Sequence, residues 1–234
     1  MKDPGLRPET GILESSTDEE ARAYLEEQLR NHQFELTQLP RDADPLDVAK
    51  VKMDIANTQL GLEQNENAWN EARAAFDVFV EAEDWESAIE ACDIMYQTEQ
   101  AASILALVHG VWLSVTYPVD PEYTIGMMSN IIDETPNNSD GAAVAAATAH
   151  YIVGIRASDE KHDSLSFLTK NMITKVAQRH SDVKSQDKLD FWMEKMNLND
   201  PEKFLPMMGT VIDAIANGQW WFDRDALRDR LPVN

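Results

Sequence analysis

Five aspartates at nearly even spacing divide most of this 234-residue chain into units of similar length. Three of them begin the stretches DPLD, DPEY and DPEK, at Asp44, Asp120 and Asp200, and weaker versions lie around Asp84 and Asp159. The intervals are therefore 40, 36, 39 and 41 residues. Aspartate can accept hydrogen bonds from the free N–H groups of a first helical turn, and proline fits directly after it because that position needs no donor. Each aspartate therefore predicts the start of a helix.

Each interval has room for two helices and a turn. Breaks in the helical pattern fall inside the intervals, at residues 65–67, 97–100, 135–140, 181–182 and 217–218. The pattern gives ten or eleven helices and no convincing strand. We therefore expect an all-α fold of consecutive antiparallel helical hairpins, stacked either as a short α-solenoid or as a compact helical bundle.

The first residues lack this pattern. Thr17 and Glu20 have the spacing of a capping box, which predicts a helix from there to about Phe34. The expected organisation is a flexible tail over residues 1–15 and a single all-helical domain over 16–234, with hairpins at about 44–98, further hairpins at 99–217 and an aromatic C-terminal cap at 218–234.

Residues 65–95 repeat themselves. Five positions recur sixteen residues later: Trp69, Ala72, Ala75, Phe76 and Phe79 become Trp85, Ala88, Ala91, Cys92 and Met95. A helix ending in Leu60-Gly61 precedes Asn67-Ala68-Trp69-Asn70-Glu71-Ala72, and Phe79 precedes Glu83-Asp84-Trp85-Glu86-Ser87-Ala88. This pattern, mainly within residues 45–98, resembles the tetratricopeptide repeat. The resemblance implies stacked hairpins that bind a protein segment in a concave groove.

The net charge of −22 restricts the choice of partner. An acidic surface repels phosphate backbones and anionic membranes, so we expect neither nucleic acid nor a membrane as a ligand. A basic or amphipathic protein segment fits the charge best. A mimic of nucleic acid would require acids at regular spacing along one surface.

Cysteine and hydropathy place the chain in the cytoplasm by default. Cys92 is the single cysteine, so no internal disulfide can form, and it is expected to be a buried apolar residue. The N-terminus has no apolar segment of a secretory signal, and the apolar run at 101–115 is too short to span a bilayer.

Two central apolar stretches each carry one histidine, His109 and His150. Each is expected to be a core residue with a hydrogen-bonding partner. The alternative is a small-ligand or metal-binding protein, even an enzyme, with a site between the helices that carry these two histidines. No motif for a nucleophile, a phosphate loop, a zinc site or a dinucleotide is present, so we expect neither catalytic residues nor a bound metal or cofactor.

The C-terminal segment is aromatic and basic. It contains the candidate partner-binding residues Trp220, Trp221, Phe222, Arg224 and Arg228. Aromatic residues and arginine dominate interface hot spots, so the segment either folds back as a cap on the last hairpin or anchors another chain or a second copy of this one. Taken together, the sequence favours a non-enzymatic scaffold, adaptor or assembly factor that binds a protein segment.

Overall fold

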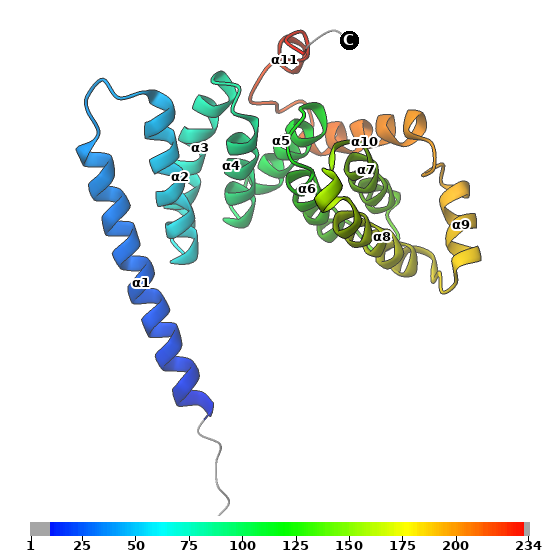
Figure 1. The fold of residues 1–234 in the computed structure, drawn as a ribbon, viewed down its shortest axis with the longest axis horizontal. Coiled ribbons are helices and arrows are strands. Elements are labelled where there is room, and N and C mark those ends of the chain that lie inside the picture. The colour runs from blue at the N-terminus through cyan, green and yellow to red at the C-terminus, as the bar shows by residue number, and fades with distance from the viewer. Residues whose placement is uncertain (1–9, 232–234) are drawn as a thin grey trace, which may run out of the picture.

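The computed structural model describes residues 10–231, which form eleven helices and no strand (Figure 1). The all-α prediction is confirmed. The helices are α1 (Thr10–Gln38), α2 (Pro45–Gly61), α3 (Asn65–Glu81), α4 (Trp85–Gln97), α5 (Ser103–Thr116), α6 (Pro121–Glu134), α7 (Asp140–Arg156), α8 (Asp159–Ser181), α9 (Gln186–Lys195), α10 (Pro201–Ala216) and α11 (Arg224–Arg228).

The spaced aspartates open every second helix. The carboxylates of Asp44, Asp84, Asp120 and Asp200 accept hydrogen bonds from backbone N–H groups in the first turns of α2, α4, α6 and α10. Asp159 is the first residue of α8 rather than its cap, and Ser158 occupies the cap position. Five hairpins therefore start where the sequence predicts, because capping depends only on neighbouring residues.

The first helix begins earlier than expected. α1 starts at Thr10 rather than at the capping box of Thr17, and it ends at Gln38 rather than near Phe34. Residues 10–15 are thus helical and not a tail, while the first nine residues lie outside the described part of the chain. Extending a helix costs far less than starting one, and no proline interrupts residues 10–38.

The first helices of four hairpins form a row. α2 contacts α4, α4 contacts α6, and α6 contacts α8, while each of α3, α5 and α7 connects one member of the row to the next. These helices share a rotational phase, because α4, α6 and α8 each bury the residues seven, eight and eleven positions after the cap. The hairpins therefore stack with the same side of each first helix turned inward.

The last hairpin does not continue the row. α10 packs against α7 and α5, which are second helices of earlier hairpins, and α9 contacts α8 (Figure 1). α10 also runs without a break through Pro206. The chain therefore combines a solenoid-like row with a final hairpin that covers the opposite side.

The centre of the stack is closely packed. A Cβ on Gly110 of α5 would lie 2.5 Å from Sδ of Met127 and 2.9 Å from Cβ of Cys92, so only glycine allows this approach of α4, α5 and α6. Cys92 is fully buried, as expected, and its burial raises the pKa of the thiol. Across residues 10–231, no helix combines the length and the apolar character that crossing a bilayer requires.

Candidate functional site

A hollow of about 720 Å³ lies along the row of first helices, between α2, α4 and α6. We call it the acidic groove. Six carboxylates line it, together with apolar side chains, and no lysine or arginine does. Its lining residues are Met53, Asp54, Asn57, Glu86, Ile89, Glu90, Asp93, Ile94, Gln97, Asp120, Glu122, Tyr123, Gly126 and Met127.

Hydrogen bonds between α4 and α6 orient the carboxylates. The Tyr123 hydroxyl donates to Oε1 of Glu90 over 2.7 Å. Nδ2 of Asn130 donates to Oδ1 of Asp93 over 3.1 Å. Glu86 accepts the backbone N–H of Asp120 over 3.0 Å. The acids are therefore held in place by the fold rather than left free to rotate.

Asp93 is a half-buried carboxylate of the groove. Burial raises its pKa, and hydrogen bonds from the amides of Gln97 and Asn130 oppose that rise. An anion that has lost part of its water gains more from a nearby cation than an exposed one does. Asp93 therefore combines partial burial with an orientation fixed by two amide donors, Nε2 of Gln97 and Nδ2 of Asn130.

A single lysine forms ion pairs with two of the six carboxylates of the groove. Nζ of Lys161, on α8, lies 2.9 Å from Asp120 and 3.2 Å from Glu122. The pKa of the Asp120 carboxyl is lowered, first by the backbone N–H of Glu122 and then by Lys161. The carboxylates of α2 and α4 have no such cation within the groove lining.

The residues that line the groove were not predicted, although the acids on α4 follow a simple register. Glu86, Glu90 and Asp93 lie two, six and nine positions after the cap Asp84, so they form one stripe about 10 Å long on α4. Counting positions from each predicted cap would have identified this stripe. In the sequence alone, the acids are too numerous to stand out.

The C-terminal aromatic residues lie against α3 and α5. Trp221 stacks on the ring of His109, with centroids 4.2 Å apart, and meets Trp69 and Phe76 edge to face. Phe222 packs on Phe76 as well. We call residues 218–231 the C-terminal strap. The segment folds back as a cap, and it reaches beyond its own hairpin, because the apolar surface that its rings cover lies on the second helices of the first two hairpins.

His109 ties the strap to α5. Its Nδ1 lies 2.6 Å from the carbonyl oxygen of Leu105, and its Nε2 accepts the backbone N–H of Trp221 over 2.9 Å. Since Nε2 accepts, the proton is on Nδ1 and the ring is neutral. Burial, as the largest cause, lowers the pKa of His109 to about 4.

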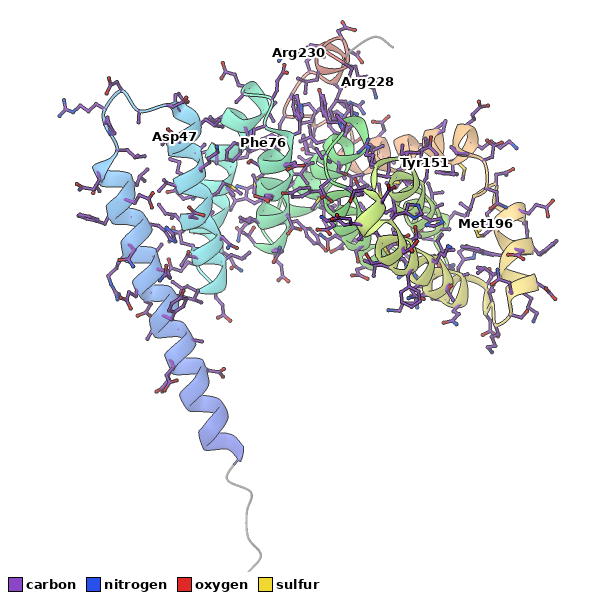
Figure 2. All side chains as sticks on the ribbon, viewed as in Figure 1. Asp47, Phe76, Tyr151, Met196, Arg228 and Arg230 are labelled. Carbon is purple, nitrogen blue, oxygen red and sulfur yellow. The ribbon has the colours of Figure 1, made fainter. Side chains whose placement is uncertain are left out.

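The arginines of the strap also make contacts within the chain. Arg224 forms an ion pair with Asp213 of α10 over 2.6 Å and covers the ring of Trp220. Arg228 lies over the ring of Trp112. Figure 2 shows Arg228 and Arg230 together at the C-terminal end. The candidate partner-binding residues are thus gathered in one place, where they hold three hairpins together.

The two central histidines do not meet. His109 binds Leu105 and Trp221, whereas Nδ1 of His150 lies 2.8 Å from the hydroxyl of Thr169 on α8. Both are satisfied core or half-buried residues, as the sequence favoured. Within the described residues, no group of three His, Cys, Asp or Glu side chains is placed to hold a metal ion.

No family model matches the chain, and neither the curated proteins nor the solved structures searched contain a match.

Proposed function

We propose that this protein is a non-enzymatic binding scaffold whose acidic groove holds a basic, partly apolar segment of another protein. The observation that carries the proposal is the lining of the groove. Six carboxylates surround an apolar floor that includes Ile89, Ile94 and Met127, and no basic residue lines it.

The chemistry of the groove selects the ligand. Lysine or arginine side chains would pair with Glu86, Glu90 and Asp93, and apolar side chains would displace water from the floor. The stripe on α4 is about 10 Å long, which equals two turns of a ligand helix or three residues of an extended strand. The net charge of −22 would attract such a segment and repel nucleic acid.

The resemblance of residues 45–98 to tetratricopeptide hairpins supports the same proposal. The resemblance implies a protein segment that is bound in a concave groove. Here the groove is lined by α2, α4 and α6, which are first helices. We also propose a cytoplasmic location for this protein.

Peptide binding tests this function. Three fluorescent peptides of equal length, composed of Lys and Leu, Lys and Ser, or Glu and Leu, are titrated with the protein and followed by anisotropy. We expect the Lys-Leu peptide to bind best and to weaken as salt rises, the Lys-Ser peptide to bind less well, and the Glu-Leu peptide not to bind.

A matched pair of variants locates the binding. Glu90→Gln with Asp93→Asn removes one Glu and one Asp from the groove and should weaken the Lys-Leu peptide by about tenfold or more. Asp187→Asn with Glu194→Gln removes the same charges from the exposed surface of α9 and should have little effect. Equal loss in both variants would mean that only net charge matters, which contradicts a specific groove.

A further inference from the structure

One face of α8 is both apolar and basic. Phe167 and Leu168 are 68% and 46% exposed, and Asn171 and Lys175 follow them on the same helical face, with Lys170 at its edge. Residues 164–181 contain no aspartate or glutamate, although the chain has 42 acids. In a protein this acidic, such a face is unusual. No other described helix covers it, because α10 leaves the row and packs on α7 and α5.

A second helix lacks a partner at the opposite end of the row. Leu25 of α1 packs beside Gly61, the last residue of α2, so the part of α1 before Leu25 extends beyond α2 (Figure 1). Residues 18–24 are all exposed. An isolated helical stretch of this length is marginally stable in water, so it gains from any surface on which it can pack.

The exposed side of α1 complements the face of α8. Tyr24 and Phe34 are 61% and 66% exposed and lie away from the side that faces α2. Residues 18–27 contain five acids and one arginine, and Glu20 and Glu27 flank Tyr24 on the same side. Tyr24, an exposed aromatic side chain among acids, thus matches the apolar pair Phe167 and Leu168 among lysines.

We propose that α1 of one molecule packs on the exposed face of α8 of a second copy. Phe167 and Leu168 then meet Tyr24, and Lys170 and Lys175 lie near Glu20 and Glu27. The net charge of −22 opposes self-association in general, so the acid-free α8 is where an acidic helix of another copy meets the least repulsion. Neither surface contributes a residue to the acidic groove, so this contact and groove binding succeed or fail separately.

The contact joins different surfaces of the two molecules. α1 packs on α2 at the beginning of the row and α8 lies at its end, so a pair of molecules still has one free α1, on one molecule, and one free α8, on the other. Such head-to-tail association gives open chains or rings rather than a closed twofold dimer. One pair of helices buries less than the roughly 1,200 Å² of a standard interface, so the association is expected to be weak.

Sedimentation over a wide range of protein concentration tests the proposal. The native chain should form dimers and then larger species as concentration rises. Phe167→Ser with Leu168→Ser, and separately Tyr24→Ser with Glu20→Lys and Glu27→Lys, should each weaken association by about tenfold or more. These side chains are exposed, so helical content and thermal stability should stay unchanged. A native chain that is monomeric throughout, or variants that associate as the native chain does, would overturn the proposal.

Mixing the two variants gives the sharpest test. The α8 variant keeps a working α1, and the α1 variant keeps a working α8, so the mixture should form one-to-one dimers and nothing larger. A mixture that remains monomeric while the native chain associates would mean that another surface is responsible, and would overturn the proposal.

Discussion

The two sides of the row of hairpins differ in the chemistry of their side chains and in whether the chain covers them. On the groove side, α2, α4 and α6 present carboxylates to an open hollow of about 720 Å³. On the opposite side, α3 and α5 present aromatic rings that the C-terminal strap covers, with a neutral histidine bound at both nitrogens. The acidic side is an open hollow, whereas the aromatic side is covered by the chain itself.

The largest expected effect is the loss of Phe76, which lies beneath the strap. Its side chain is fully buried and contacts His109, Trp221 and Phe222. Phe76→Ala should lower the free energy of unfolding by about 3–5 kcal/mol, measured by urea denaturation. A loss below about 1 kcal/mol would mean that the strap does not close this side.

Protonation of His109 should have the next largest effect. Its pKa is about 4 in the fold and about 6.5 in the unfolded chain, so the unfolded state binds the proton more readily. Stability is therefore fully present above pH 6.5 and declines as the pH falls toward 4, by roughly 3 kcal/mol. His109→Gln cannot take up this proton. Between pH 6.5 and 4, the free energy of unfolding of the native chain should therefore fall by roughly 3 kcal/mol more than that of the variant. An equal pH dependence of the two free energies would contradict a buried neutral ring.

A smaller effect is expected where the strap meets the loop after α5. The Tyr117 hydroxyl donates to the carbonyl oxygen of Leu227 over 3.1 Å, in a buried position. Tyr117→Phe removes the hydroxyl and leaves the ring stacked on Trp85. Stability should fall by about 1 kcal/mol, and hydrogen exchange in α11 should become faster. Unchanged exchange in α11 would show that this bond does not hold the strap.

The smallest expected effect on stability is at the groove, where the substitution should stabilise the fold slightly instead of destabilising it. Burial raises the pKa of Asp93, so its charged form is less favourable in the fold than in the unfolded chain. Asp93→Asn should change stability at neutral pH by only about 0.5 kcal/mol, in the stabilising direction. It should nevertheless weaken binding of the Lys-Leu peptide. A clearly destabilised variant would mean that Asp93 stabilises the fold and would contradict its role as part of the binding surface.

Local features of the fold could be predicted, and its long-range features could not. Asp44, Asp84, Asp120 and Asp200 cap helices because capping involves only the next two or three residues. The motif at Asp200 is the same as at Asp44 and Asp120, yet α10 leaves the row that α2 and α6 join. Nothing near Asp200 indicates this, because the choice depends on apolar surface offered by α5 and α7.

The same limit applies to the site. Trp220, Trp221 and Phe222 stand out in the sequence as neighbours, but Phe76 and His109, on which they pack, lie more than a hundred residues away in the sequence. The carboxylates of α4 line a groove, and are held in position, only because α6 packs beside α4. The type of a residue suggests the kind of contact that it can make. Which residue it contacts depends on how the hairpins pack, and the local sequence does not show this.

Hydrogen exchange with and without the Lys-Leu peptide tests the central claim most directly, because it reports which side of the row binds. We predict slower exchange in the amides of α4 and α6, which line the acidic groove, and unchanged exchange in the C-terminal strap. Protection confined to residues 218–231, with α4 and α6 unaffected, would contradict the account.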